Sequence, residues 1–339
     1  MNKAIPAVES ASQTRLDGLE RIRAQLASAQ KIVMTTHLNA DGDGAGSEGA
    51  LGGWLRRHGH EATIVNPTPM PDGYRFLLDG LPAWIPADQE GQAAIREADL
   101  ILVIDTAEVS RLGQVMPLIK SHRILTIDHH PAVTPSLGEP SVRDDTAAAA
   151  GELIYDLIIG AGDAPTLPEA RALYAAIATD TGSFRYGNTT SRVHQITAHL
   201  VAIGVDPEDM YHRLYGGYTL ARLALLQRAL AGIQTHPTIP VAWIGLSAAD
   251  MEETGASRDD VEGIVEYARR LVGIEVAVLL RELPDGRTKI SLRTSGDTDV
   301  AAAARALGGG GHVKAAGAVI EAPLAESERQ VLEVLERAF

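Results

Sequence analysis

The sequence has no cysteine, few aromatic residues and no excess of basic charge. Without cysteine the chain can form neither a disulfide framework nor a zinc–thiolate site, and it has no cysteine nucleophile. Its formal net charge of −14 at pH 7 argues against binding of long nucleic acid through a broad basic surface. Aromatic residues make up only 4% of the chain, whereas channels for long single strands commonly use aromatic platforms. A small or short anionic ligand is compatible with this composition, because a few local cations can hold it.

Long apolar runs are also absent. No uncharged apolar segment reaches the roughly 18 residues that a membrane-spanning helix needs. Residues 1–14 are polar and lack the apolar segment of a secretory signal peptide. The sequence therefore predicts a soluble, cytoplasmic protein with no membrane partner.

The first 130 residues alternate between short apolar runs and longer helix-like stretches, which is typical of βα units in a parallel sheet. The expected strands are 32–36, 62–65, 100–104 and 124–127, and the expected helical stretches between them are 48–59, 90–98 and 111–121. Residues 147–200 have a mostly helical pattern.

A different composition begins near Thr238, where three strand-like segments surround a helical one. The strands are expected at 238–247, 275–283 and 288–295, and the helix at 258–271. With 339 residues the chain exceeds what one core usually organises. We therefore predict an α/β protein with an N-terminal parallel-sheet domain over 1–205, a helical connector over 206–236 and a smaller C-terminal α/β domain over 237–339. A cleft is expected between the two domains, and Gly216 and Gly217 suit a hinge.

Acidic and histidine residues follow the expected parallel strands at the point where each strand ends. They are His37, Asp41 and Asp43 after the first strand, Asp105 after 100–104, and Asp128, His129 and His130 after 124–127. Asp180 ends an apolar helical segment in the second half of the domain. Because the carboxyl ends of parallel strands share one edge of a sheet, where ligands bind, we expect these side chains to converge there.

Such a convergence of carboxylates calls for cations. Ionised carboxylates a few ångströms apart repel one another, so some must protonate or a cation must neutralise them. Mixed oxygen and nitrogen ligands suit Mn²⁺ or a similar divalent ion better than Ca²⁺. One ion cannot use so many ligands, and two ions roughly 3.5–4 Å apart are the arrangement that activates water and holds phosphoryl oxygens.

Each piece taken alone also has an ordinary structural interpretation. An aspartate after a strand is usually a helix cap or turn residue, and the sequence "DGDG" at 41–44 is a common turn. Adjacent histidines can be loop residues, and Asp180 can cap the following turn. The coincidence of four segments at one predicted edge favours the metal site.

The ordered set H-x3-D-x-D, a strand-terminal Asp, D-H-H and D-T-G resembles the four motifs of the DHH phosphoesterases. The segment "GGGGHVKAAG" at 308–317 is similar to the signature of the DHH-associated C-terminal domain. The resemblance thus spans nearly residues 20–339, and length and layout are nearest to the NrnA-like group of oligoribonucleases and pAp phosphatases.

The resemblance implies a role for each motif residue. His37 and Asp41 would bind one metal, Asp43, His129 and Asp180 the other, and Asp105 would bridge both. His130 and Asp128 would act beside Asp105 in catalysis, by orienting His129 or by hydrogen-bonding the transferred phosphate. The implied cofactors are two divalent ions, with Mn²⁺ favoured and Mg²⁺ or Co²⁺ as alternatives.

The C-terminal domain contains candidate substrate contacts. Arg293 and Ser295 end an expected strand, and arginine can hold a phosphate with two parallel hydrogen bonds. The glycine run before His312 can offer backbone N–H groups to an anion. A flexible turn and a water-exposed arginine are the alternative interpretation, and the family resemblance favours substrate binding. The predicted contacts are Arg293, Ser295, Gly309, Gly310, Gly311 and His312.

The predicted activity is hydrolysis of short oligonucleotides, from di- to pentanucleotides, to mononucleotides, or of pAp to AMP, or both. Alternatives within the family are a RecJ-like single-strand exonuclease, an inorganic pyrophosphatase and a phosphodiesterase for linear products of cyclic dinucleotides such as pApA. The "GGGGH" segment disfavours the pyrophosphatase, and the acidic charge disfavours long strands and duplexes. A non-catalytic nucleotide sensor has no need of a complete two-metal site. The sequence leaves the oligomeric state open between monomer and dimer.

Overall fold

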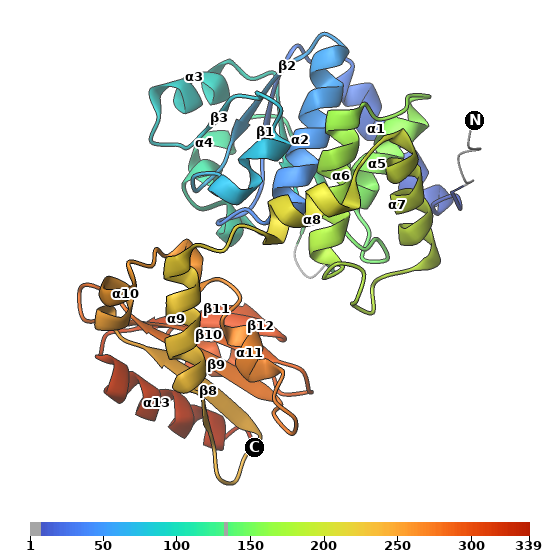
Figure 1. The fold of residues 1–339 in the computed structure, drawn as a ribbon. Coiled ribbons are helices and arrows are strands. Elements are labelled where there is room, and N and C mark those ends of the chain that lie inside the picture. Colours follow the sequence, from blue (N-terminus) through green and yellow to red (C-terminus); the bar gives the residue numbers. More distant parts are fainter. Residues whose placement is uncertain (1–7, 132–134) are drawn as a thin grey trace. The chain divides into compact units, whose positions relative to one another are not determined.

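A computed structural model describes residues 8–131 and 135–339 of the chain. It divides into a first unit, Met1–Gly216, and a second unit, Gly217–Phe339 (Figure 1). The division falls inside the segment that the sequence analysis treats as a connector. Helix α8 (Pro207–Tyr215) belongs to the first unit and helix α9 (Leu220–Ala231) to the second.

The first unit contains a six-stranded parallel sheet in the order β3-β2-β1-β4-β5-β6. Its strands are β1 (Lys31–Thr35), β2 (Glu61–Val65), β3 (Ala83–Trp84), β4 (Leu100–Ile104), β5 (Ile124–Asp128) and β6 (Ser141–Arg143). The four expected strands and the α/β class are confirmed. The outer strands β3 and β6 are not apparent in the sequence, because two or three residues are too few to show an apolar period.

Helices cover both faces of this sheet (Figure 1). They are α1 (Gln13–Leu26), α2 (Gly42–Arg57), α3 (Gln89–Glu97), α4 (Met116–Ile119), α5 (Ala150–Gly160), α6 (Leu167–Asp180) and α7 (Ser191–Ile203), with 3₁₀ helices η1 (Asp72–Leu77) and η2 (Val109–Val115). The helix expected over 111–121 is wrong in part. Gly113 has φ 46°, a left-handed conformation that interrupts the helix, so the segment forms η2 followed by the short α4.

Alternate residues of the central strands enter two different cores. In β4, Leu102 packs into the larger core beneath α1, α2, α5 and α6, while Ile101 and Val103 pack on the opposite face. All five residues of β4 are buried, as expected for a central parallel strand covered on both faces. The carboxyl end of β4, which leads into Asp105, is therefore fixed from both sides.

Glycines let α2 and α6 approach closely in an antiparallel arrangement. A Cβ atom added to Gly46 would lie 2.4 Å from the Ala172 carbonyl oxygen, and one on Gly42 would lie 2.3 Å from the Thr179 side chain. This contact brings the N-terminus of α2 next to the C-terminus of α6. Asp43 and Asp180, which lie at these two helix ends, are thereby brought to one place.

Replacement of Gly46 by alanine should therefore destabilise the first unit. Because the added methyl group meets the backbone of α6, which cannot rotate away, Gly46→Ala should lower the free energy of unfolding by about 1–3 kcal/mol. Urea denaturation followed by circular dichroism measures this change. Gly73→Ala is the control, since a Cβ there meets nothing within 4 Å; equal stability of the two variants would contradict the close-packing argument.

The second unit has a mixed six-stranded sheet in the order β11-β12-β10-β9-β8-β7, in which only β8 and β9 are parallel. Its strands are β7 (Gln234–Thr235), β8 (Val241–Leu246), β9 (Val276–Glu282), β10 (Thr288–Thr294), β11 (Gly310–His312) and β12 (Ala315–Ile320). Its helices, besides α9, are α10 (Ala248–Thr254), η3 (Asp259–Val261), α11 (Val265–Arg269), α12 (Val300–Ala306) and α13 (Leu324–Glu336).

The three strands expected in this unit are confirmed as β8, β9 and β10. The single helix expected over 258–271 is wrong, because Gly263 has φ 79° and separates η3 from α11. In the described parts of the chain, no helix combines the length and apolar character needed to cross a membrane.

Candidate metal centre

The six predicted metal ligands lie together at the carboxyl edge of the first sheet. His37 follows β1, Asp105 follows β4 and His129 follows β5, while α2 and α6 bring carboxylates from the side. Among the described residues, three sets of three have ligand atoms within 4.8 Å of one another, and one of them is Asp105, His129 and His130. The other two sets contain only predicted metal ligands. The first of these two, hereafter the His37 group, is His37, Asp41 and Asp105, and the second, hereafter the His129 group, is Asp43, His129 and Asp180.

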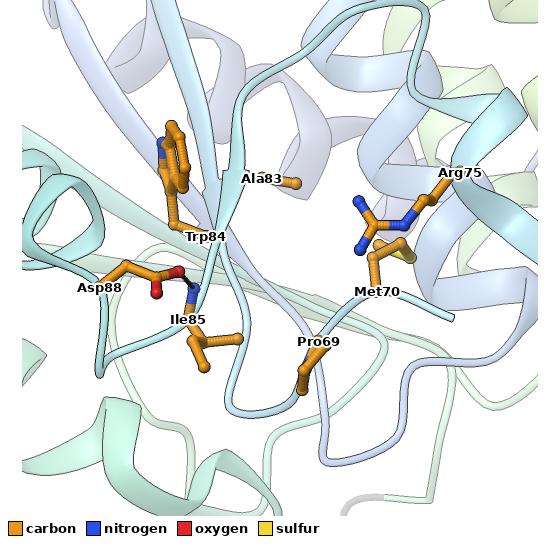
Figure 2. A pocket seen from close by; sticks show the side chains of 7 residues that line it. All are labelled: Pro69, Met70, Arg75, Ala83, Trp84, Ile85 and Asp88. Atoms are coloured by element: carbon orange, nitrogen blue, oxygen red, sulfur yellow. Dashed lines mark hydrogen bonds between the residues drawn. The ribbon is translucent and has the colours of Figure 1, made fainter. Parts of the chain in front are cut away.

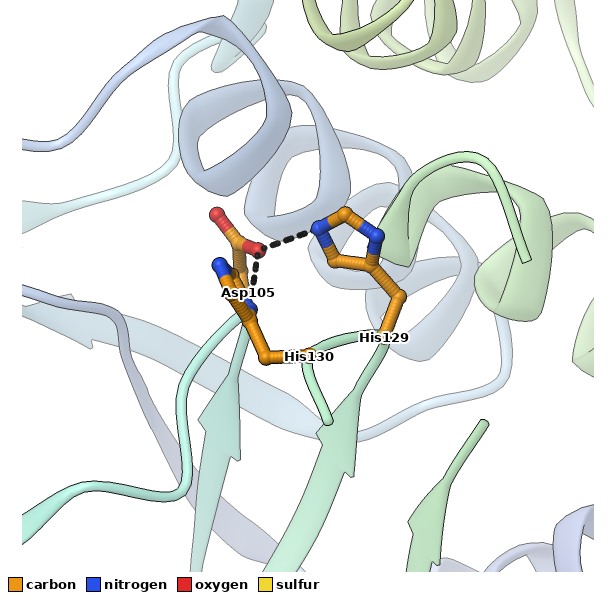
Figure 3. Close-up of side chains that lie close together, drawn as sticks. All are labelled: Asp105, His129 and His130. Atoms are coloured by element: carbon orange, nitrogen blue, oxygen red, sulfur yellow. Dashed lines mark ion pairs between the residues drawn. The ribbon is translucent and has the colours of Figure 1, made fainter. Parts of the chain in front are cut away.

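Asp105, a member of the His37 group, also faces the His129 group. Its Oδ2 is 3.3 Å from His37 Nε2, and its Oδ1 is 3.3 Å from His129 Nε2. Figure 3 shows Asp105 with His129 and His130. The Nδ1 atom of His130 lies 3.7 Å from Asp105 Oδ1, the oxygen that also faces His129. The two oxygens of one carboxylate thus face different imidazoles, which is the geometry of a bridging ligand.

The backbone of Asp105 is unusual as well. Its φ of 61° lies in the left-handed region, which aspartate and asparagine tolerate better than other non-glycine residues. Its N–H donates to the Ile127 carbonyl oxygen of β5 at 2.9 Å, so the neighbouring strand stabilises this conformation. Strained backbone of this kind is common at functional sites.

In the His37 group, the imidazole is oriented by the backbone. His37 Nδ1 lies 2.9 Å from the Leu38 carbonyl oxygen, to which it donates, so that Nε2 faces the carboxylates. Nε2 is 3.5 Å from Asp41 Oδ2. Asp41 also caps α2, since its Oδ1 accepts hydrogen bonds from the N–H groups of Asp43 and Gly44.

In the His129 group, the same imidazole edge faces the carboxylates. His129 Nε2 is 3.6 Å from Asp43 Oδ2 and 3.4 Å from Asp180 Oδ2, and its Nδ1 is 3.4 Å from the Ala147 carbonyl oxygen. Asp43 is completely buried and accepts hydrogen bonds from Ala150 N at 2.6 Å and Gly151 N at 2.9 Å. These are the first N–H groups of α5, where a helix stabilises negative charge.

The protonation of these groups reflects a surplus of negative charge. Burial opposes protonation of His37, yet the neighbouring carboxylates of Asp105 and Asp41 raise its pKa to about 10. His129 behaves in the same way: burial opposes the shift, but Asp105 and Asp43 raise its pKa to about 10. Burial and the neighbouring carboxylates raise the pKa of Asp180 to about 7. Positive charge is therefore strongly favoured at both groups.

The donor atoms fit divalent cations. Among the described residues, His37 Nε2 and Asp105 Oδ1 are buried without a partner at hydrogen-bonding geometry, although each faces an oppositely charged group. Two imidazole nitrogens with four carboxylates form a mixed nitrogen and oxygen set suited to Mn²⁺ and similar metals. The residues present therefore fit divalent metal ions.

Asp128 and His130 form a pair at the margin of this centre. Asp128 is buried, and its Oδ1 accepts from His130 N at 3.1 Å and from His130 Nδ1 at 2.8 Å. The His130 side chain is 31% exposed. Asp128 thus holds the His130 ring by its side chain, and of Asp128 and His130 only His130 reaches the surface.

The predicted substrate contacts lie in the second unit, around β10 and β11. Arg293 Nη1 donates to the Leu292 carbonyl oxygen, and its side chain is 37% exposed. Ser295 Oγ donates to the Glu275 carbonyl oxygen at 3.3 Å. Gly310 and Gly311 begin β11, which pairs with β12, and a Cβ on Gly309, just before β11, would lie 2.1 Å from the Gly317 carbonyl oxygen. Close approach of two strands therefore accounts for glycine at 309. The side chain of His312 lies outside the described residues.

A separate surface pocket of about 250 Å³ lies beside β3 (Figure 2). Its lining residues are Pro69, Met70, Arg75, Ala83, Trp84, Ile85 and Asp88. None of them is a candidate metal ligand, and the Asp88 carboxylate already accepts a hydrogen bond from Ile85 N at 2.9 Å.

The sequence matches two family domains. Residues 31–179 match the DHH family, N-terminal domain, and residues 241–339 match the DHHA1 domain. The bifunctional oligoribonuclease and PAP phosphatase NrnA of Thermus thermophilus is 31% identical over 90% of this chain and 89% of that protein. The protein of the same name from Bacillus subtilis is 26% identical over 85% of this chain and 89% of its own length.

Solved structures share the fold. An exopolyphosphatase-related protein from Bacteroides fragilis has a TM-score of 0.89 at 24% identity and covers 98% of each chain. RecJ from Thermus thermophilus in complex with Mn²⁺ has a TM-score of 0.55 at 16% identity, over 98% of this chain and 56% of RecJ. The chain is therefore a hydrolase that acts on ester bonds and belongs to the DHH family of phosphoesterases, as the motifs predicted.

Cation binding to this centre should release protons. With pKa values of about 10, His37 and His129 carry protons at neutral pH, whereas a bound cation requires the unprotonated nitrogen. The apparent affinity for Mn²⁺ should therefore rise about tenfold per pH unit for each proton released, between pH 6 and 8.5. Calorimetry in two buffers of different ionisation enthalpy measures the number of protons. Affinity independent of pH over this range would contradict the assignment of these histidines.

Proposed function

We propose that this enzyme hydrolyses di- to pentanucleotides to mononucleotides and removes the 3′-phosphate of pAp to give AMP, using two divalent cations. The observation that carries the proposal is the position of Asp105, whose two oxygens face two separate groups of histidine and carboxylate. Two adjacent cations are the arrangement suited to phosphoryl oxygens. Relatives named oligoribonuclease and PAP phosphatase, which align over most of both chains, support this choice of substrate.

In this proposal each group holds one cation. His37 and Asp41 would hold one cation and Asp43, His129 and Asp180 the other, and Asp105 would be shared by both. When present, the cations activate water and neutralise charge on the phosphoryl oxygens. Mn²⁺ is the favoured metal, with Mg²⁺ or Co²⁺ as alternatives, and the Mn²⁺ complex of RecJ, which shares the fold, agrees with this choice.

His130 is the proposed protein contact to the reacting phosphate. Its Nδ1 is held by Asp128, so contact with the phosphate or the leaving oxygen would use Nε2. Asp128 then acts as a positioning residue, which fixes the ring and sets which nitrogen faces the substrate.

The second unit is proposed to bind the part of the substrate distant from the metals. Arg293 and Ser295 at the end of β10, Gly309, Gly310 and Gly311 around β11, and His312 would contact a phosphate or base of the substrate. A bidentate arginine–phosphate contact would favour substrates that carry a second phosphate.

Substrate length provides the test of this function. A chain with net charge −14 offers no track that releases counterions from a long strand. Hydrolysis rates on a ladder from dinucleotide to about 20 nucleotides, at fixed Mn²⁺ and roughly physiological salt, should therefore fall as length increases. pAp is assayed in parallel, with pyrophosphate as the control for the pyrophosphatase alternative. A flat profile with length, or processive digestion, would favour the RecJ-like alternative instead.

Asp105→Asn tests the shared ligand. Asparagine tolerates the left-handed backbone at this position, so the variant should fold while lacking the charge that both cations need. Turnover should fall by more than about 100-fold. Loss of a residue that only supports a metal ligand costs up to about 100-fold, and loss of the ligand itself should cost more. Circular dichroism checks the fold, and retention of most activity would rule out Asp105 as the bridge.

A further inference from the structure

Two asparagines outside the proposed ligand set contact backbone atoms next to it, one on each side of Asp105. Asn66 follows β2 and lies beside the His37 group. Asn188 lies between α6 and α7 and contacts the His129 group. Neither takes part in the proposed chemistry, and neither belongs to a motif that the sequence analysis singled out.

Asn66 supports the peptide before His37. Its Oδ1 accepts a hydrogen bond from Thr36 N at 2.9 Å, and its side chain is buried. Its Nδ2 donates to Glu48 Oε2 at 2.9 Å, and Glu48, on α2, is completely buried. Glu48 thereby sets the orientation of the Asn66 amide, so that the oxygen faces Thr36. The amide links β2, α2 and the loop that carries His37.

Asn188 supports the other side. Its Nδ2 donates to the Asp180 carbonyl oxygen and to the Ala148 carbonyl oxygen, both at 3.1 Å. It therefore links the end of α6, which carries Asp180, to the segment before α5. This link joins two backbone segments that approach from different parts of the chain.

The segment 147–151 contacts the remaining members of the His129 group. Ala147 O faces His129 Nδ1, and the N–H groups of Ala150 and Gly151 donate to Asp43. Glu152 Oε2 accepts from Ala148 N at 2.9 Å, and its other oxygen pairs with Arg15 and Arg192 at 2.8 and 2.6 Å. One backbone segment thus touches Asp43 and His129, and Asn188 connects it to Asp180.

We propose that Asn66 and Asn188 are positioning residues, each for one half of the metal centre, so that the two cation affinities can be changed separately. This inference rests on the proposed two-cation function. Asp105 is the proposed ligand that faces a histidine of each group. Within the described residues, the side-chain amide of each asparagine hydrogen-bonds beside one group and not the other. Residues behind metal ligands typically change affinity by about 10–100-fold.

The test is equilibrium titration of the metal-stripped full chain with Mn²⁺, with free Mn²⁺ followed by electron paramagnetic resonance. The unsubstituted chain should bind two ions. Asn188→Ala and Asn66→Ala should each leave two ions bound, with one of them weakened about 10–100-fold. Binding of fewer than two ions by the unsubstituted chain would overturn the two-cation function, and this proposal with it.

Ligand variants then identify which ion each asparagine affects. In a His129→Ala background, which retains the His37 group, Asn66→Ala should weaken the remaining ion and Asn188→Ala should leave it unchanged. In a His37→Ala background, which retains the His129 group, Asn188→Ala should weaken the remaining ion and Asn66→Ala should leave it unchanged. Equal effects of both asparagine variants in both backgrounds, or no effect of either, would overturn the proposal while leaving two-ion binding by the unsubstituted chain intact.

Folding controls separate positioning from general destabilisation. Asn188 is exposed, so its replacement should leave the unfolding midpoint of the metal-stripped chain nearly unchanged. Asn66 is buried, and Glu48→Gln provides a second variant, because glutamine retains an oxygen that accepts from Asn66 Nδ2. Glu48→Gln should keep affinity within a few-fold, whereas Glu48→Leu should weaken the same ion as Asn66→Ala. Equal losses in Glu48→Gln and Glu48→Leu would contradict the role of the amide orientation.

Discussion

Repulsion between carboxylates crowded at one edge of a sheet is the constraint on which the rest of this structure depends. Asp105 lies at its centre, with almost no contact with solvent and with acidic neighbours on both sides. Such a group of charges is unfavourable unless positive charge enters it, because the low dielectric of the interior strengthens repulsion. The carboxylates also raise the pKa values of His37 and His129, so that positive charge is favoured at these side chains. Either protons or divalent cations can supply this charge.

The surrounding elements hold these charges in place against their mutual repulsion. Glycines on α2 permit the contact with α6 that brings Asp43 and Asp180 together. The N-terminus of α5 neutralises part of the Asp43 charge with two N–H groups. The α2–α6 contact and the N-terminus of α5 therefore contribute both to packing and to the positions of the Asp43 and Asp180 carboxylates. The stability of the first unit and the geometry of the candidate metal centre are linked in this way.

Much of the first unit and its candidate site could be predicted because their signals are local. The run at 100–104 is apolar throughout, since β4 is buried on both faces, and this pattern identifies a central parallel strand. Once such strands are located, residues directly after them must share one edge, and Asp105 and His129 do. The spacing of these residues also identified the DHH family, which the domain matches confirm.

The amino-acid sequence by itself thus determined the class of fold, the family and the strand ends that carry the acidic and histidine residues. Only the tertiary structure decided that Gly309 meets Gly317, that Gly113 and Gly263 interrupt expected helices, and that Asp128 orients His130. It also decided the contacts of Asn66 and Asn188, whose hydrogen bonds join residues 8 to 40 positions apart. The physical reason is that periodicity records which face of an element is buried, whereas hydrogen bonds between distant residues form only after those faces have packed.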